Sequence, residues 1–405
     1  MSALLKGLHK QAAAPSLVPS STNDDLEEQA ELESGDTFAL PVPALTRAPR
    51  QTSKQLYTPL QGSDYFAQAL QVEVTGSNET TRQFRAYYTP ATSLREQLTP
   101  PPKAARQVHP EIDIDPATLF NGVESPKPAK RDVLVVCHHG AGYSGLSYAL
   151  FAKQLVQLSN GQLGVLSFDA RGHGKTADAN DLSLQSLSRD LVDLVKTLYP
   201  EREQAPDLLL VGHSMGGAVV TDACPKLQAH VANVIGLAVL DVVEGTAIEA
   251  LRTMNAYLDA QPKGFASIEA AIEWHVKSRT IRNLESARVS VPALLSPSEQ
   301  DPALPFSWRT DLRSTSAHWQ GWFEGLSDKY LACPTPKLLV LAGTDRLDKP
   351  LMIAQMQGKY QLVVFQEAGH CLHEDAPERL ATTVLDFWRR NDRTNVLAGV
   401  KKVGQ

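Results

Sequence analysis

The chain has 405 residues, of which 42% are apolar and 21% are charged, so it is long enough for one large or two ordinary domains. Its 39 basic and 45 acidic residues give a net charge of -6, without the basic surplus typical of proteins that bind nucleic acid. The 4 cysteines, at positions 137, 224, 333 and 371, form neither a disulfide framework nor a metal-binding pattern, so no metal site is expected.

Hydropathy argues against a membrane protein. No window approaches the roughly 18 consecutive apolar residues of a membrane span. The first residues run into Lys6, His9 and Lys10 without the apolar segment of a secretory signal. We therefore expect a soluble protein of a reducing compartment, with no membrane partner. This compartment is the cytoplasm, and the nucleus is a second possibility.

Two stretches within the first 130 residues are predicted to lack regular structure. Residues 1–62 mix serine, proline and an acidic run without a sustained apolar period, so they bury too little surface to offset chain entropy. Residues 99–130 are rich in proline and equally poor in periodic apolar positions. We expect a disordered N-terminal tail over 1–62 and a surface excursion without secondary structure over 99–130.

Between these stretches lies a predicted β-hairpin. Apolar residues alternate with polar ones over 70–74 and again over 84–88, and a Gly-Ser-Asn turn signal stands at 76–78. An alternation of period two is typical of a strand with one buried face. The two runs therefore predict a pair of antiparallel strands.

From Asp132 onward, short apolar runs alternate with helical patterns, which is typical of a parallel sheet covered by helices on both faces. Between the second and third runs, apolar residues recur at helical spacing over 184–198, with Ser183 as the helix cap. We expect one α/β domain over residues 63–395 and a C-terminal tail over 396–405. The predicted strands are Val133 to Cys137, Leu163 to Phe168, Leu208 to Val211, Ile235 to Leu240, Lys337 to Ala342 and Gln361 to Phe365.

A long interval separates the predicted strand that ends at Leu240 from the one that starts at Lys337. It carries helical patterns and four of the 5 tryptophans. An interval of this length exceeds the usual connection between two strands of one sheet. We expect a lid or cap over residues 246–332, inserted above the sheet.

The strongest local signal is Gly212-His-Ser-Met-Gly-Gly217, which stands directly after a predicted strand and before an apolar run. It matches the G-x-S-x-G motif of the α/β-hydrolase fold, in which a serine lies on a sharp turn from strand to helix. Glycines are needed there because strand and helix pass closely. Ser214 is therefore the predicted nucleophile.

A nucleophilic serine needs a base and donors for the oxyanion, and both are predicted at other strand ends. After the first strand of the α/β region, the sequence from His138 to Tyr143 resembles an oxyanion loop, so we expect the N–H groups of Ala141 and Met215 to face the developing charge. His370 follows the last predicted strand and precedes a helical pattern. It is the predicted base, and His373 is its one serious rival.

Two aspartates are candidates for the acid that orients the base. Asp241 follows one predicted strand and Asp345 follows the next, and both satisfy the order serine, acid, histidine of this fold. Asp345 stands where most members of the fold carry the acid, whereas Asp241 stands at an alternative strand end. Spacing alone leaves both possibilities open.

Several segments resemble the eukaryotic protein phosphatase methylesterase family, whose members remove the methyl ester from the C-terminal leucine of the protein phosphatase 2A catalytic subunit. The resemblance extends over about residues 57–390, and two of its segments are specific to the family, Val242-Val-Glu-Gly-Thr-Ala247 and Arg282-Asn-Leu-Glu-Ser-Ala-Arg288. Further segments are Asp64-Tyr-Phe66, the serine motif, Trp319 to Leu326, Asp345-Arg-Leu-Asp-Lys349, Met356-Gln-Gly-Lys-Tyr360 and Gly369 to Glu378.

The resemblance implies a triad of Ser214, Asp241 and His370, and so favours Asp241 over Asp345 as the acid. It also implies that ester cleavage uses no metal or organic cofactor. The implied partner is the phosphatase catalytic subunit or core enzyme, whose methylated C-terminal tail enters the site. Two rival functions stay open: an esterase of the same fold that acts on small molecules or lipids, and a binding protein that sequesters inactive phosphatase.

Overall fold

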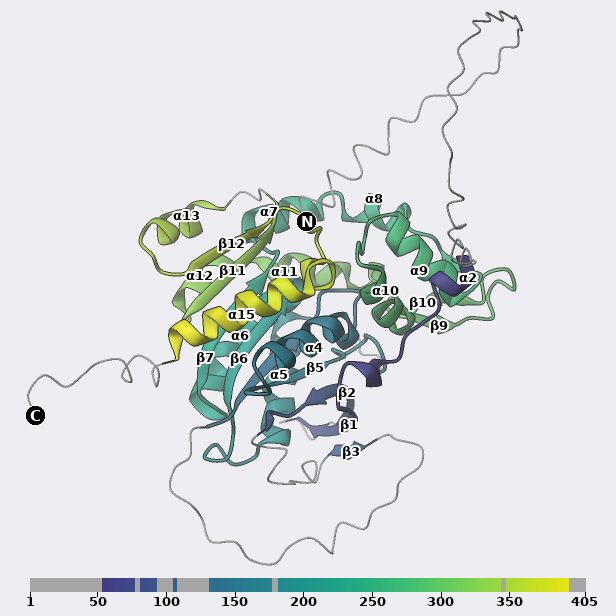
Figure 1. Ribbon diagram of the computed structural model, residues 1–405. Coiled ribbons are helices and arrows are strands. Elements are labelled where there is room, and N and C mark those ends of the chain that lie inside the picture. Colours follow the sequence, from purple (N-terminus) through teal and green to yellow (C-terminus); the bar gives the residue numbers. More distant parts are fainter. Residues whose placement is uncertain are drawn as a thin grey trace, which may run out of the picture.

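A computed structural model describes residues 53–76, 81–92, 105–107, 131–176, 181–343 and 347–392 of the chain (Figure 1). Within these ranges a central sheet has the strand order β12-β11-β7-β6-β4-β5-β2-β1-β3. Its strands are β1 Gln68–Thr75, β2 Thr81–Thr89, β3 Ala105–Gln107, β4 Val133–His138, β5 Leu163–Phe168, β6 Asp207–His213, β7 Val234–Leu240, β11 Lys337–Ala342 and β12 Gln361–Phe365.

The part of the sheet from β12 to β5 is parallel, and each neighbouring pair in it runs in the same direction. Each of these strands coincides with a run that the sequence predicts, within three residues at either end. The reason is that strands buried on both faces read as nearly continuous apolar runs. The predicted α/β-hydrolase fold class is confirmed.

The predicted hairpin is also confirmed. β1 pairs with β2 in antiparallel register, with Leu70 opposite Ala86 and Val72 opposite Phe84, and β2 joins the parallel part of the sheet through β5. The turn residues 77–80 lie outside the described ranges. The hairpin therefore extends the sheet beyond β5 with antiparallel strands.

The proline-rich stretch over 99–130 contains a strand that the sequence does not predict. Residues Ala105–Gln107 form β3, which pairs antiparallel with the edge strand β1. Such pairing needs only backbone hydrogen bonds, so it leaves no apolar period in the sequence. The expectation of an excursion without any secondary structure is wrong at these three residues, and the rest of 99–130 lies outside the described ranges.

The expectation of a disordered tail over 1–62 also needs correction at its end. Residues 1–52 lie outside the described ranges, but Ser53–Leu56 form a short helix, α2. Farther along, the Leu60 N–H donates to the carbonyl of Arg288 at 2.9 Å. Contacts with the distant Arg288 hold the residues around Leu60 in place. Such contacts produce no local apolar period in the sequence.

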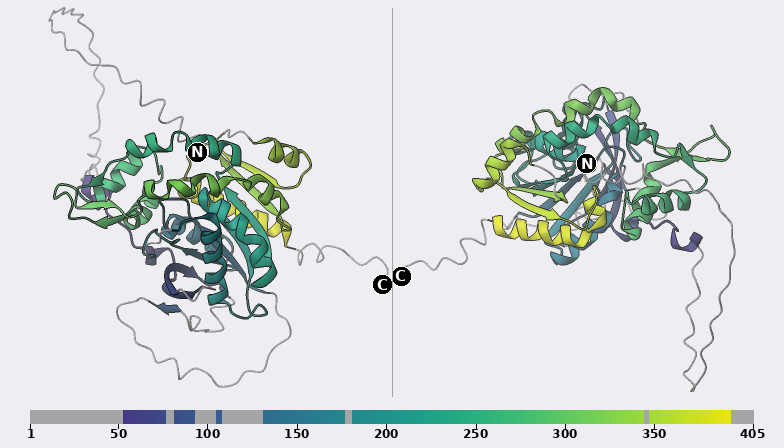
Figure 2. Two further views of the ribbon diagram at one scale, coloured as in Figure 1. Left: turned by 180° about the vertical axis from the view of Figure 1, so that it is seen from behind. Right: turned by 90° about the horizontal axis from the view of Figure 1, so that it is seen from above.

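Helices cover both faces of the sheet, as predicted. Along β4, Leu134 and Val136 face one apolar core together with helices α5 and α6, while Val133, Val135 and Cys137 face a second core with α4 and α15. This alternation follows from the period of two along a strand. Helix α15 lies in front of the sheet in Figure 1 and behind it in the left view of Figure 2.

The helices on the sheet are α4 Ala149–Leu158, α5 Leu184–Leu198, α6 Met215–His230, α13 Lys349–Met356, α14 Leu372–Asp375 and α15 Pro377–Asn391. The predicted helix over 184–198 is confirmed, and the Ser183 hydroxyl caps it by accepting from the Ser186 N–H. Short 3₁₀ helices are η1 Gly62–Asp64, η3 Gly145–Tyr148, η4 Val291–Leu294 and η5 Arg313–His318. Among the described residues, no helix is long and apolar enough to cross a membrane.

The interval between β7 and β11 contains a separate group of elements, which we call the cap. Its strands form a small sheet of order β8-β10-β9, and part of it surrounds a third apolar core. Trp274 and Trp308 pack against this core, whereas Trp319 and Trp322 are buried in the core of the main sheet. The cap elements are α7 Glu244–Leu251, α8 Met254–Asp259, β8 Gly264–Phe265, α9 Ile268–Lys277, α10 Leu284–Ser290, β9 Leu295–Pro297, β10 Phe306–Trp308, α11 Trp319–Phe323 and α12 Leu326–Ala332.

Candidate active site

Ser214 lies on the sharp turn that the G-x-S-x-G motif predicts. β6 ends at His213, α6 begins at Met215, and the serine between them has φ 53° and ψ -119°. A side chain at positive φ is strained, and such strain persists only where the surroundings hold it. Here the Ser214 N–H donates to the Leu240 carbonyl at 2.9 Å, and the Ser214 carbonyl accepts from Gly217 N–H at 2.9 Å.

Two glycines allow this turn to form. A Cβ on Gly212 would lie 2.2 Å from the carbonyl oxygen of Gly216, and one on Gly216 would lie 2.2 Å from the carbonyl oxygen of His138. Real side chains do not tolerate such distances to backbone atoms. The glycines therefore let α6 start directly beside β6 and beside the loop that follows β4.

Asp241 and His370, which follow β7 and β12, contact one another through their side chains. The Nδ1 atom of His370 lies 2.7 Å from Oδ2 of Asp241, and the Ala342 N–H donates to Oδ1 of Asp241 at 2.7 Å. Asp241 is 1% exposed and His370 is 8% exposed. Burial disfavours a carboxylate, and two N–H donors favour it, so the geometry suits an ionised acid that orients the imidazole.

The sequence also offers Asp345 as an alternative acid and His373 as an alternative base. Asp345, the other candidate acid, lies outside the described ranges. His373 is fully buried, and its ring lies 4.4 Å from the ring of His213 and 4.6 Å from that of Tyr148. Burial lowers the pKa of His373 to about 3, so this imidazole is neutral. The described structure places His370, and not His373, on the cavity beside Ser214.

The predicted oxyanion loop follows β4 and is held by histidines. Nε2 of His139 accepts from Ala170 N–H at 2.9 Å, and Nε2 of His173 accepts from Gly142 N–H at 3.0 Å. Nδ1 of each ring lies 2.8 to 2.9 Å from a backbone carbonyl, so Nδ1 carries the proton in both. The two imidazoles thereby link the loop containing Ala141 to the loop after β5.

Burial keeps the histidines of this loop uncharged. It lowers the pKa of His138 to about 4, and it lowers the pKa of His139 well below the usual value, with His173 and His138 adding to the effect. A protonated ring would lose the lone pair that accepts the backbone N–H. His139 therefore acts as a hydrogen-bonding link between this loop and the loop after β5.

A cavity of about 550 Å³ opens above Ser214 and His370. Its lining includes Ala141 of the predicted oxyanion loop and, from the cap, Tyr257, Trp274, Trp308 and Leu312. The sequence alone identifies none of the cap residues that line this cavity. No local motif marks these positions, because they meet the loops around Ser214 only through the tertiary fold.

Comparison with known proteins places this site in a family. A sequence model of the α/β hydrolase family matches residues 135–383. Protein phosphatase methylesterase 1 of Cryptococcus neoformans is 42% identical over 365 residues, which cover 87% of this chain and 83% of that protein. The protein of the same name from Gibberella zeae is 50% identical over 296 residues, covering 71% and 73% of the two chains.

The chain belongs to the protein phosphatase methylesterase family of α/β hydrolases. As a member of this family it is a serine ester hydrolase. The crystal structure of E-2-(acetamidomethylene)succinate hydrolase has a TM-score of 0.55 at 16% identity and covers 79% of this chain and 98% of its own. That likeness supports the fold alone.

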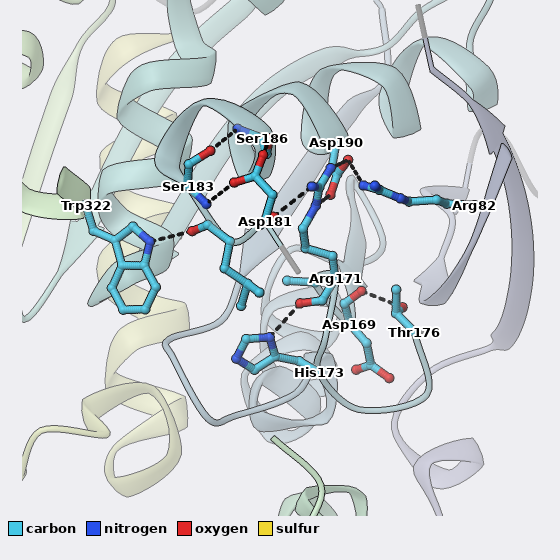
Figure 3. Close-up of polar contacts among 12 residues, drawn as sticks. Arg82, Asp169, Arg171, His173, Thr176, Asp181, Ser183, Ser186, Asp190 and Trp322 are labelled. Carbon is cyan, nitrogen blue, oxygen red and sulfur yellow. Dashed lines mark hydrogen bonds and ion pairs between the residues drawn. The ribbon is translucent and has the colours of Figure 1, made fainter. Parts of the chain in front are cut away.

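In this methylesterase-family chain, the loop after β5 is fastened to helix α5 by a buried ion pair (Figure 3). The guanidinium of Arg171 binds both carboxylate oxygens of Asp190 and donates to the Asp181 carbonyl at 2.8 Å. Arg82 adds a more distant contact with Asp190, at 3.6 Å. Arg171 thus supports the loop that carries His173.

Asp169 organises the same loop from its other end. Its carboxylate accepts from Gly145 N–H and Lys175 N–H, both at 2.8 Å, and burial raises its pKa to about 6. Gly174 has φ 52°, and a Cβ there would lie 2.2 Å from Cγ of Asp169. A glycine is therefore required for the loop to fold around this carboxylate.

Replacing Gly216 by alanine is expected to disturb the site. The added Cβ would meet the carbonyl oxygens of His138 and His139, so α6 and the oxyanion loop must separate. We expect kcat on a small ester to fall by roughly 10²-fold. Gly321→Ala is the matched control, because no atom lies within 4 Å of its added Cβ. Equal activity of the two variants would contradict the close approach described here.

Asp190→Asn is expected to destabilise the fold by roughly 3–5 kcal/mol, because the buried Arg171 guanidinium would then face a neutral amide in place of the Asp190 carboxylate. The free energy of unfolding from urea titration measures the effect. Glu273→Gln removes an exposed pair with Lys277 and should leave stability unchanged. A loss no larger than that of the control would show that the buried pair does not stabilise the protein.

Proposed function

We propose that this chain hydrolyses the methyl ester of the C-terminal leucine of the protein phosphatase 2A catalytic subunit. One observation carries the proposal: a buried Asp241–His370 pair lies beside a cavity that also exposes Ser214, in a chain 42% to 50% identical to proteins named protein phosphatase methylesterase 1. In this proposal Ser214 is the nucleophile, His370 the base and Asp241 the acid.

The tautomer of His370 supports its assignment as the base. Nδ1 faces the Asp241 carboxylate at 2.7 Å, so Nδ1 carries a proton and Nε2 keeps its lone pair. Nε2 takes the Ser214 proton as the serine oxygen attacks the ester carbonyl. Asp241 then stabilises the imidazolium that forms, without itself taking the proton.

The oxyanion of the tetrahedral intermediate needs N–H donors that are not already engaged. Within the described residues, the N–H groups of Ala141 and Met215 donate to no other group. Met215 is the first residue of α6, whose N-terminus carries partial positive charge. We assign both N–H groups to the oxyanion, which would stabilise its charge relative to the neutral ester.

Collapse of this intermediate breaks the bond to the methoxy group, and His370 returns its proton so that methanol leaves. Water then attacks the acyl-enzyme with His370 again as the base, which frees Ser214 and yields a carboxylate. The product differs from the substrate by this charge, which the apolar part of the cavity lining does not stabilise.

The test is to incubate the protein with methylated phosphatase core enzyme and to follow loss of the ester and release of methanol. A methylated tail peptide and p-nitrophenyl acetate serve as parallel substrates. We expect the intact phosphatase to be the best of the three. If the small ester is cleaved while the methylated phosphatase is left unchanged, the chain is an esterase of another specificity.

Ser214→Ala should abolish demethylation, with a loss of about 10⁴ or more, because the nucleophile acts mainly in the transition state. Binding of the phosphatase, measured by surface plasmon resonance, should change little. Loss of binding in parallel with activity would mean that the serine is part of the docking surface.

Asp241→Asn should lower kcat by about 10⁴ while the fold stays intact by circular dichroism, because the wrong His370 tautomer is favoured and the ion pair is lost. Asp345→Asn is the comparison variant and should retain most activity. The reverse result, an inactive Asp345→Asn and a nearly normal Asp241→Asn, would move the acid to the commoner position of this fold.

A further inference from the structure

We propose that His213 is a positioning residue that holds the base loop, residues 366–371 between β12 and α14, against the nucleophile turn at Ser214 and against the oxyanion loop after β4. This inference rests on the proposed function, because it assigns His213 a role in the reaction of Ser214 and His370. His213 is the last residue of β6, directly before Ser214. Its imidazole contacts the oxyanion loop and the loop that carries His370 through its hydrogen bond and its packing.

The first contact is with the base. Nε2 of His213 lies 2.8 Å from the backbone carbonyl oxygen of His370, and the two rings lie 4.6 Å apart. Since a carbonyl only accepts, Nε2 of His213 carries the proton and donates it. The hydrogen bond fixes the backbone from which the His370 side chain reaches toward Ser214.

The second contact is with the oxyanion loop. A Cβ on Gly140 would lie 2.8 Å from Nδ1 of His213 and 3.3 Å from Cβ of Ser214. The loop backbone therefore lies directly on the imidazole and on the nucleophile. Tyr143 of the same loop packs edge-on against the His213 ring, with centroids 6.0 Å apart.

The environment keeps His213 in one protonation state. It is fully buried, and burial, followed by the nearby His373 and His370, lowers its pKa well below the usual value. Titratable side chains that face it include His370 from the base loop, His373 from α14, and Tyr143 and Tyr148 from the segment after β4. The ring is thus a neutral donor, whose tautomer the His370 carbonyl selects.

The His213 hydrogen bond should affect the rate of the chemical step, because it sets the position of His370 relative to Ser214. The loops arise from distant parts of the chain, and the His213 bond spans 157 positions in the sequence. A displacement of about 1 Å between nucleophile and base can cost roughly 10²-fold in rate. Losing the donor should therefore slow the chemical step more than it weakens substrate binding.

The test compares His213→Leu, which removes the donor, with His213→Gln, whose amide N–H reaches about as far as Nε2. His230→Gln, on the exposed end of α6, is the control. The measurements are kcat and KM on p-nitrophenyl acetate, the rate of labelling by a fluorophosphonate, and the melting temperature. We expect His213→Leu to lower kcat and the labelling rate by roughly 10- to 100-fold with KM nearly unchanged.

His213→Gln should retain most of the wild-type kcat and labelling rate, and His230→Gln should match the wild type. A leucine variant that keeps kcat within about twofold would overturn the inference. So would equal losses in the leucine and glutamine variants that follow their melting temperatures, since His213 would then only stabilise the core. If the wild type itself reacts with neither ester nor fluorophosphonate, the proposed triad chemistry fails instead.

Discussion

The hydrogen bond between Asp241 and His370 is the contact on which the arrangement of the loops around Ser214 depends. Asp241 directly follows β7 and has φ 50°, where a side chain is strained, and its carboxylate also accepts from the Ala342 N–H at the end of β11. One buried carboxylate thereby connects the ends of two neighbouring parallel strands to the loop after β12. The position of His370 follows from the parallel sheet, because the carboxyl ends of its strands meet at one edge.

Buried histidines also connect the loops around Ser214, through hydrogen bonds from their rings to backbone groups. His139 and His173 each bond backbone groups through both ring nitrogens, with Nε2 reaching another loop, and His213 bonds the His370 carbonyl through Nε2. A neutral imidazole carries one donor and one acceptor on opposite sides of a rigid ring, so it links two loops at a fixed separation. Hydroxyl side chains are shorter, and charged side chains would be costly in so dry an environment.

Sequence patterns predicted the parallel strands, the hairpin and the nucleophile turn, because apolar runs and glycine spacing are local signals. They left the acid open, because Asp241 and Asp345 both follow strands, and the contact between Asp241 and His370 is a tertiary one that no local pattern reports. The strand Ala105–Gln107 and the ordered residues before Ser63 were missed. The strand bonds to β1, and Thr58 and Leu60 bond to Arg288, and such long-range bonds leave no local period. The cavity-lining cap residues were missed for the same reason.

The contacts of residues 57–65 set a limit on how far the N-terminus can be trimmed. Arg288 of α10 donates to the Thr58 carbonyl, and the Tyr65 hydroxyl donates to Glu285 of the same helix at 2.7 Å. This segment thus runs as a strap from the cap to the first strand of the sheet. Proteolytic cleavage before residue 53 would leave the strap whole, whereas a cut within it would separate the cap from one of its anchors on the sheet.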